Sequence, residues 1–436
     1  MPQIFDNGFS KLYQSNAFEL PIPDNSVDCV VTSPPYWGLR DYGIGEWVGG
    51  DEGCDHIGPP HRTRTGFNER WHGKQFQEDK QGSLDEPYKD ICGKCGAKRI
   101  DKQIGLEPTP EEYCTNMVKV FREVWRVLKS TGTVWLNLGD SYSSGSRTTT
   151  TNDRFRGDTM VNTVRTPVSK DLKQKDLVGI PWRVAFALQA DGWYLRSDII
   201  WSKPNPMPES VTDRPTKAHE YVFLLTKSPR YYYDADAIRE PQITEASGKM
   251  GSGLIGTHNG MSHGGWNPVG ERVWNPLGRN KRSVWEIPTQ PYSEAHFATY
   301  PQKLVEPCIL SGTSEKGVCA ECGKPWERIV HVSGGTIGQG WHNHEADIVR
   351  GMRDNSNGKS TDGTYKREHK GWQPTCTCNA DTVPATVLDP FVGSGTTLLV
   401  AHRLGRKSIG VDLNDEYLEM AQKRLESMPI PMLLTT

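Results

Sequence analysis

Apolar positions along the chain follow two patterns, which are consecutive runs typical of buried strands and spacings of three or four residues typical of helices. The two patterns alternate. They predict strands at 27–32, 133–138 and 194–201, helices at 113–128 and 181–190, and a hairpin formed by 221–226 and 231–233. This alternation predicts an α/β fold.

The pattern is clearest towards the C-terminus. A strand at 386–389, a glycine-rich turn at 390–395, a helix at 396–404, a strand at 408–411 and a helix at 415–425 form a complete β-α-β-α unit. Because such units pair their strands in parallel, we expect a parallel sheet whose strands end at a common edge.

Composition narrows the class of protein. A chain of 436 residues predicts two or three domains, and its 35% hydrophobic and 24% charged residues indicate a globular protein. Lys and Arg number 51 against 53 Asp and Glu, so nucleic acid would have to bind through local basic patches. The sequence contains no run of about 18 apolar residues and does not start like a secretory signal, so we expect a cytoplasmic protein with no membrane partner.

A glycine-rich turn is the first candidate site. It lies in Asp389-Pro390-Phe391-Val392-Gly393-Ser394-Gly395-Thr396-Thr397, where Gly393 and Gly395 allow the backbone to approach a ligand. Asp412 ends the next predicted strand about 20 residues later, where an acid hydrogen-bonds ribose in nucleotide-binding α/β folds. Neither a P-loop nor a complete Gly-x-Gly-x-x-Gly fingerprint is present, so the turn predicts a ribose-containing ligand, with a simple tight turn as the alternative.

A proline-bearing turn, Ser33-Pro34-Pro35-Tyr36, is the second candidate site and follows the strand at 27–32. Two consecutive prolines fix the backbone and remove its donors, which leaves carbonyl oxygens and the Ser33 hydroxyl as acceptors beside an aromatic ring. This combination suits a planar substrate with an exocyclic amine. The alternative is a rigid exit from the strand.

These two motifs, in this order, resemble the β-type amino-methylating DNA methyltransferases, whose (Asp/Ser/Asn)-Pro-Pro-(Tyr/Phe) motif precedes the cofactor motif. The resemblance implies transfer of a methyl group from S-adenosylmethionine to cytosine N4 or adenine N6 of double-stranded DNA. It implies that the Ser33 hydroxyl and the Pro34 carbonyl accept the amine hydrogens while Tyr36 stacks on the flipped base. The cofactor-binding residues that it implies are Asn16, Pro301, Asp389, Phe391, Gly393, Ser394, Gly395, Thr396 and Asp412.

The resemblance also predicts the organisation of the chain as a Rossmann-like methyltransferase sheet with a circularly permuted motif order. Polar inserts far longer than an ordinary loop of about 4–6 residues interrupt this core. The predicted parts are a catalytic-strand part (1–40), an insert with a zinc site (41–106), core (107–239) with a mobile loop (141–175), a target-recognition region (240–290), a core helix (291–311), a second zinc-bearing insert (312–380) and the cofactor-binding part (381–436).

The ten cysteines are spaced in a way that predicts metal binding. Cys319-x-x-Cys322 and Cys376-x-Cys378 supply four thiolates in two close pairs, which suits a closed tetrahedral zinc site. A second site is predicted from Cys54, His56, Cys92 and Cys95, with His61 or His72 as alternatives to His56. The alternatives are free thiols or, for Cys92-x-x-Cys95, a redox pair. Cys29 lies in an apolar strand and is expected to be packed core.

Several features of function stay open at this level. Basic stretches at 62–74, 147–165 and 272–282, the last with Trp266, Trp274 and Trp285 nearby, are candidate DNA contacts or solvated loops. Serine at the first motif position favours cytosine N4, with adenine N6 as the alternative. RNA or protein glutamine is a further alternative, as is a zinc-bearing DNA-binding protein with an inactive methylase core. A partner restriction nuclease and the choice between monomer and homodimer are not determined by the sequence.

Overall fold

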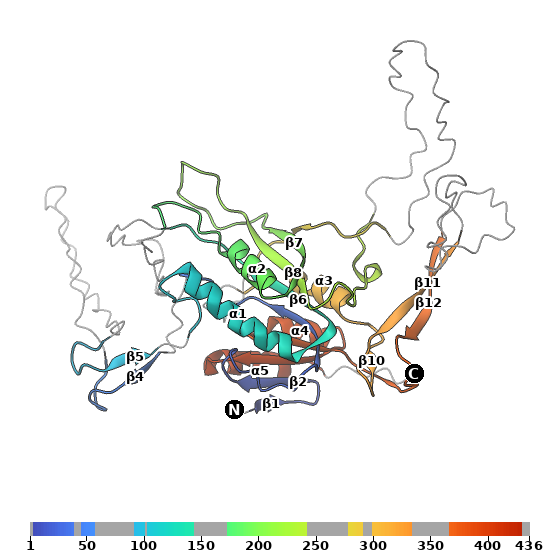
Figure 1. The fold of residues 1–436 in the computed structure, drawn as a ribbon, viewed down its shortest axis with the longest axis horizontal. Coiled ribbons are helices and arrows are strands. Elements are labelled where there is room, and N and C mark those ends of the chain that lie inside the picture. The colour runs from blue at the N-terminus through green and yellow to red at the C-terminus, as the bar shows by residue number, and fades with distance from the viewer. Residues whose placement is uncertain are drawn as a thin grey trace, which may run out of the picture. The chain divides into compact units, whose positions relative to one another are not determined.

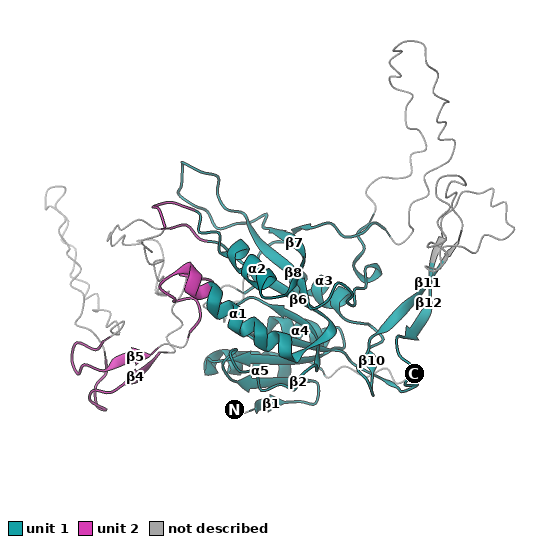
Figure 2. Ribbon diagram, in the orientation of Figure 1, with its two compact units in different colours: residues 1–34, 114–140, 177–436 teal, residues 35–113, 141–176 magenta. Residues whose placement is uncertain are grey.

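The computed structural model describes residues 3–38, 45–56, 91–100, 103–143, 172–241, 278–290, 299–333 and 366–429. The chain divides into two compact units (Figure 2). Unit 1 comprises residues 1–34, 114–140 and 177–436, and unit 2 comprises residues 35–113 and 141–176. The boundary between the units falls inside the proline-bearing turn, between Pro34 and Pro35.

Unit 1 is built on a nine-stranded sheet in the order β1-β2-β15-β14-β3-β6-β8-β7-β9 (Figure 1). The strands are β1 (Gln3–Asp6), β2 (Ser10–Gln14), β3 (Val27–Thr32), β6 (Leu128–Leu138), β7 (Tyr194–Ser202), β8 (His219–Thr226), β9 (Val284–Glu286), β14 (Thr386–Asp389) and β15 (Lys407–Asp412). The strands β2, β15, β14, β3 and β6 are mutually parallel, whereas β8 runs antiparallel to both of its neighbours. The five parallel strands therefore place their carboxyl ends at one edge.

The helices are α1 (Pro110–Val127), α2 (Ile180–Ala190), α3 (Gln302–Gly312), α4 (Thr396–Arg403) and α5 (Asp415–Glu426), with a short 3₁₀ turn η1 (Asp236–Ile238). On one face of the sheet, Cys29, Val31 and Trp135 form a core cluster with Leu304 of α3 and Val400 of α4. Figure 1 shows α1 and α2 on the other side of the sheet. The sheet is thus covered by helices in the manner of an α/β fold.

Short antiparallel pairs form outside the main sheet. They are β4 (Glu46–Val48) with β5 (Lys98–Ile100), β10 (Val318–Cys319) with β13 (Thr382–Val383), and β11 (Trp326–Ser333) with β12 (Lys366–Pro374). Each two-stranded pair has too little surface to bury a core of its own. Among the described residues, no helix has the length and apolar character needed to cross a bilayer.

The predicted elements agree with the structure at most positions. The strands at 27–32 and 386–389 are confirmed as β3 and β14, and the predicted helices at 113–128, 181–190, 396–404 and 415–425 correspond to α1, α2, α4 and α5. The predicted hairpin is wrong, because β8 pairs with β6 and β7 and not with residues 231–233. β8 is a central strand whose Val222–Leu225 stretch is buried, so its partners come from distant segments.

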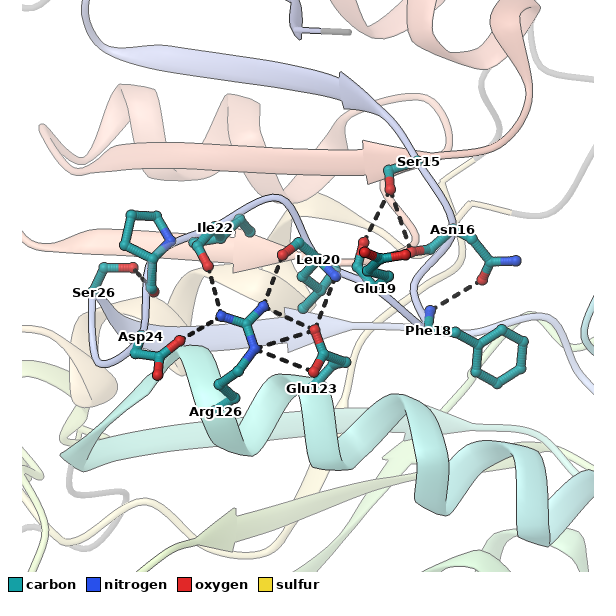
Figure 3. A network of polar contacts seen from close by, with 11 residues as sticks. Ser15, Asn16, Phe18, Glu19, Leu20, Ile22, Asp24, Ser26, Glu123 and Arg126 are labelled. Atoms are coloured by element: carbon teal, nitrogen blue, oxygen red, sulfur yellow. Dashed lines mark hydrogen bonds and ion pairs between the residues drawn. The ribbon is translucent and has the colours of Figure 1, made fainter. Parts of the chain in front are cut away.

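The segment between β2 and β3 is fastened to α1 by one arginine (Figure 3). Arg126 donates to the carbonyl oxygens of Leu20 (2.8 Å) and Ile22 (2.9 Å) and forms ion pairs with Asp24 and Glu123. The hydrogen bond from Arg126 keeps the Glu123 pKa below its ordinary value, and Glu123 in turn accepts from the Leu20 amide at 3.0 Å. The segment that follows β2 at the carboxyl edge is therefore held in one conformation.

We predict that Arg126→Ala lowers the free energy of unfolding by about 1–3 kcal/mol, because several charged hydrogen bonds to a partly buried segment are lost. Arg122→Ala is the matched control on the same helix. Arg122 pairs with Asp191 at 2.6 Å but is 67% exposed, so its loss should cost less than about 1 kcal/mol. Urea unfolding of both variants measures the difference, and equal losses would show that Arg126 does not hold the segment.

Candidate functional site

The two sequence motifs come together at the carboxyl edge of the sheet. β3 and β14 are parallel neighbours, with Val387 paired to Cys29 and Leu388 to Val30. Ser33 follows β3 directly and the glycine-rich turn follows β14 directly, so both begin at the same edge. Ser33 is partly exposed there, whereas Pro34 is buried.

A buried carboxylate joins the two motifs. Asp389 is fully buried, and its Oδ1 accepts hydrogen bonds from Thr32 Oγ1 at 2.7 Å and from the Phe391 amide at 3.1 Å. Its Oδ2 accepts from Tyr300 OH and from Thr397 Oγ1, both at 2.8 Å. Burial raises the pKa of Asp389 to about 6 although all four hydrogen bonds act to lower it. The predicted cofactor residue Asp389 thus has both oxygens engaged within the protein.

The glycine-rich turn is tied to the neighbouring strand by Asp412. Its Oδ2 accepts from the Gly393 amide at 2.9 Å and its Oδ1 accepts from the Asn414 amide at 3.0 Å, while burial raises the pKa of this carboxyl. Gly393 and Gly395 have φ angles of 47° and 80°. A Cβ on Gly395 would lie 2.9 Å from the Ala421 Cβ, so this position requires glycine for both backbone and packing reasons.

The predicted residues of the turn differ in the direction they face. Ser394 and Thr396 are buried. Arg424 of α5 donates to the Ser394 carbonyl at 2.6 Å, to the Ser394 hydroxyl at 2.9 Å and to Thr396 Oγ1 at 3.5 Å. These two side chains therefore support the turn from the side of α5, and Phe391 and Gly393 are its partly exposed members.

Asn16 lies next to the end of β15. β2 is parallel to β15, and the Ser15 amide donates to the Asp412 carbonyl at 3.0 Å. Asn16 Oδ1 accepts from the Phe18 amide at 3.0 Å, which fixes the orientation of its amide (Figure 3). An acid, an amide, an aromatic ring and a glycine turn at one edge are the groups that bind a nucleoside in α/β folds, so the residues fit a ribose-containing cofactor.

The remaining predicted residues are Pro301 in unit 1 and Pro35 and Tyr36 in unit 2. Pro301 is buried at the N-cap of α3, next to Tyr300, and its carbonyl accepts from the Leu304 amide at 2.9 Å. In unit 2, the Pro35 carbonyl accepts from Tyr113 OH at 2.9 Å and Trp37 Nε1 donates to the Glu107 carbonyl at 2.8 Å. The Pro35 carbonyl is therefore used to hold the turn. Tyr36 is partly exposed.

A polar cluster that the sequence analysis missed lies where β6 ends at the carboxyl edge. Asn137 Nδ2 donates to Glu220 Oε2 at 3.2 Å, and Glu220 also forms an ion pair with Lys203. Lys217 Nζ is 4.0 Å from Asp140 Oδ2, and burial lowers the pKa of Lys217. The polar residues that directly follow the predicted strand at 133–138 could have indicated this cluster. Thr32 pairs with Leu136 across β3 and β6, so Asn137 follows Leu136 as Ser33, the first residue of the proline-bearing turn, follows Thr32.

The structure brings together the first predicted metal set. Ligand atoms of Cys54, His56, Cys92 and Cys95 all lie within 4.8 Å of one another. The Cys54 and Cys92 sulfurs are 3.7 Å apart, and Cys95 Sγ is 3.5 Å from His56 Nδ1. Backbone hydrogen bonds, first that of Asp51, lower the pKa of the Cys95 thiol to about 6. Trp47 stacks on His56 with ring centroids 4.6 Å apart and fixes the imidazole plane.

The second predicted set is brought together as well. Ligand atoms of Cys319, Cys322, Cys376 and Cys378 lie within 4.8 Å of one another. Backbone hydrogen bonds, first that of Cys322, lower the pKa of the Cys319 thiol to about 7. All four thiols are free rather than joined in disulfides.

Cys29 and Trp285 both lie in the core of the sheet. Cys29 is buried and its pKa is raised to about 12 by burial, which agrees with packed core. Trp285, offered as an aromatic contact for DNA, is instead buried in the core. Arg279, Lys281 and Arg282 pair with Glu240, so these basic residues are partly neutralised. The stretches 62–74 and 147–165, Trp266 and Trp274 lie outside the described residues, as do His61 and His72.

The fold is that of an α/β protein in which the proline-bearing turn and the glycine-rich turn start at the carboxyl edge of the parallel strands. The sequence profile of the N6/N4 DNA methylase family matches residues 27–321 and 381–423, and the chain belongs to this family. It is an S-adenosylmethionine-dependent DNA methyltransferase.

The similarity to known methyltransferases extends over nearly the whole chain. Type II methyltransferase M.Cfr9I of Citrobacter freundii is 34% identical and the match covers 93% of this chain and 83% of the relative. M.SmaI of Serratia marcescens is 33% identical, with coverages of 91% and 84%. The solved structure of PvuII DNA methyltransferase (cytosine-N4-specific) is 14% identical, with a TM-score of 0.46 and coverages of 97% and 89%.

Proposed function

We propose that this enzyme methylates the exocyclic amine of a base flipped out of double-stranded DNA, with cytosine N4 as the target. The observation that carries the proposal is the pairing of β3 with β14, which starts the Ser33 turn and the glycine-rich turn at one edge of the sheet. A methyl donor bound at one turn can then face an amine held at the other.

We assign cofactor contacts to the partly exposed members of the predicted set and to the buried Pro301. Asp412 would accept from the ribose hydroxyls, Asn16 would lie near the adenine, and Phe391 and Gly393 would border the cofactor. Pro301 would border its methionine end, while Ser394, Gly395 and Thr396 shape the turn. When bound, S-adenosylmethionine supplies a methyl group on a positively charged sulfur.

We assign the activation of the amine to Ser33 and Pro34. The lone pair of an exocyclic amine is delocalised into the ring, and acceptors on both hydrogens favour the pyramidal, more nucleophilic nitrogen. The new C–N bond forms as the C–S bond breaks, the electron pair of that bond stays on sulfur, and the nitrogen then loses a proton to solvent. Tyr36 would stack on the extruded base.

The choice of base rests on Ser33, because serine at this position favours cytosine N4 among the enzymes that the motif resembles. Adenine N6 is the alternative. A zinc-bearing DNA-binding protein with an inactive core is the second alternative, and the intact Ser33, Gly393 and Asp412 argue against it.

The remaining organisation follows from the same proposal. The order of the two motifs along the chain would be a circular permutation of the methyltransferase core, and residues 240–290 would recognise the target sequence. Because the relatives are named type II methyltransferases, we propose that the enzyme serves a restriction-modification system with a partner nuclease in the cytoplasm.

Labelled methyl transfer tests the proposed function. The purified enzyme is incubated with S-adenosylmethionine carrying a labelled methyl group and mixed-sequence duplex DNA, and the DNA is digested to nucleosides for mass analysis. We expect N4-methylcytosine. N6-methyladenine would establish the alternative base, and cofactor binding without label in DNA would contradict the proposed activity.

Ser33→Ala should lower the rate of methyl transfer at least about 100-fold, because one acceptor for the amine is lost. The affinity for S-adenosylmethionine, measured by calorimetry, should stay within about threefold. Ser26→Ala, at a partly exposed position before β3, is the control and should leave both unchanged. Equal loss of rate and cofactor affinity in Ser33→Ala would contradict the assigned role.

We also propose that each of the two ligand sets holds one structural Zn²⁺. A tetrahedral zinc with bonds of about 2.3 Å to sulfur and about 2.0–2.1 Å to nitrogen has edges of about 3.8 Å between sulfurs and about 3.6 Å between sulfur and nitrogen. The Cys54–Cys92 and Cys95–His56 separations of 3.7 and 3.5 Å fit these edges. Four protein ligands per ion leave no open position for catalysis.

Metal analysis tests the zinc proposal. We expect about two zinc ions per chain, and about one in each of Cys95→Ser and Cys322→Ser. Cys114→Ser, on α1 and outside both sets, should retain two. Chelation should lower the unfolding temperature, because binding free energy contributes to folding. A purified protein that contains no zinc and takes up none when Zn²⁺ is added would refute the proposal.

A further inference from the structure

The backbone pairing between β3 and β14 stops short of the site. The pairs that link these strands are Val387 with Cys29 and Leu388 with Val30. Beyond these pairs, Asp389 directly follows Leu388, and Thr32, two residues after Val30, donates from its Oγ1 to Asp389 Oδ1 at 2.7 Å. The ends of the two strands are therefore joined through side chains, by this hydrogen bond and by Thr397 Oγ1, which lies 3.2 Å from the Val31 carbonyl oxygen and 2.8 Å from Asp389 Oδ2.

Each of the four donors to Asp389 comes from a different part of the site. Thr32 precedes the catalytic Ser33, and the Phe391 amide belongs to the glycine-rich turn. Tyr300 precedes Pro301 at the start of α3, and Thr397 lies in the first turn of α4. One fully buried carboxylate therefore connects the catalytic turn, the cofactor turn and two helix starts.

We propose, on the basis of the proposed methyl transfer, that Asp389 is a positioning residue that fixes the catalytic turn relative to the cofactor turn through Thr32. Its oxygens are engaged by protein donors, so it acts through the residues that it holds rather than by touching a ligand. An in-line displacement is sensitive to errors of about 1 Å in the approach of the nucleophile, so loss of this link should slow the transfer step itself.

The ionisation of Asp389 can distinguish a positioning role from a role in stability alone. Its described contacts are neutral donors, and burial raises the pKa of the one ionisable group among them, Tyr300, so that phenol stays neutral near pH 6. Burial raises the pKa of Asp389 from 3.8 to about 6. Below that pH the carboxyl gains a proton and loses the uniform acceptor geometry on which the four bonds depend.

Stability and activity should respond to this titration in opposite directions. The pKa of Asp389 in the folded state lies above its unfolded value of 3.8. Its contribution to the free energy of unfolding is therefore largest below pH 3.8 and is lost as the pH rises towards 6. Activity should instead rise over this window, as the ionised form appears. A role limited to stability would give the same direction for both.

Threonine 32 supplies a matched pair of variants. Thr32→Val keeps the shape and removes the hydroxyl, whereas Thr32→Ser keeps the hydroxyl. Under single-turnover conditions with saturating cofactor and DNA, we expect Thr32→Val to be at least about tenfold slower than Thr32→Ser, which should stay within about threefold of the unaltered enzyme. Cofactor affinity should change by less than about threefold in both. Equal rates for the two variants, or a loss of cofactor affinity that matches the loss of rate, would overturn the positioning role.

The pH profile gives the second measurement. The single-turnover rate of the unaltered enzyme should rise about tenfold from pH 5 to pH 7, as expected for one group with a pKa near 6. Asp389→Asn, which cannot titrate, should be slower and lack this rise. An unchanged rise in Asp389→Asn would overturn the inference. No methyl transfer by the unaltered enzyme at any pH would contradict the proposed function and this role together, whereas an active enzyme with equal Thr32 variants contradicts positioning alone.

Discussion

The structure depends on the parallel pairing of β3 with β14. These strands are separated by more than 350 residues along the chain, yet their central residues pair directly in the sheet. Because parallel strands end at the same edge, this pairing alone determines that the proline-bearing and glycine-rich turns start side by side. The roles proposed for Ser33, Gly393 and Asp412 depend on this arrangement.

The long inserts impose a different physical requirement. The β4–β5 and β10–β13 pairs contain three and two residues per strand, and pairs of this size bury too little apolar surface to be stable alone. In both regions, four ligand side chains converge instead. A metal ion that cross-links these side chains would stabilise each region. The region would then not need a hydrophobic core of its own. Bound metal would in this way allow the chain to carry large inserts.

The sequence predicted the parts of the fold in which local pattern and tertiary environment agree. β3 and β14 are buried on both faces, so their apolar runs were unambiguous, and the ligand spacing of both metal sets was local enough to be recognised. The supposed hairpin after residue 221 failed because β8 takes partners from distant segments, which no local pattern encodes. Likewise, Trp285 is aromatic and lies near basic residues, but only the packed sheet shows that it is core. The role of Asp389 was hidden for the same reason, since Thr32 and Tyr300 are distant in sequence.

A buried carboxylate at the meeting point of the two motifs raises the question of why apolar packing does not serve there. Apolar contacts would cost less desolvation, but they are non-directional and tolerate sliding of one surface over another. Four hydrogen bonds to one planar group restrict both distance and angle. The raised pKa of Asp389 shows that burial outweighs these bonds in their effect on its ionisation, so part of the stability is given up. The loss of stability is offset by a gain in alignment. The two turns must be aligned for an in-line displacement, and the hydrogen bonds of Asp389 fix this alignment before the DNA base arrives.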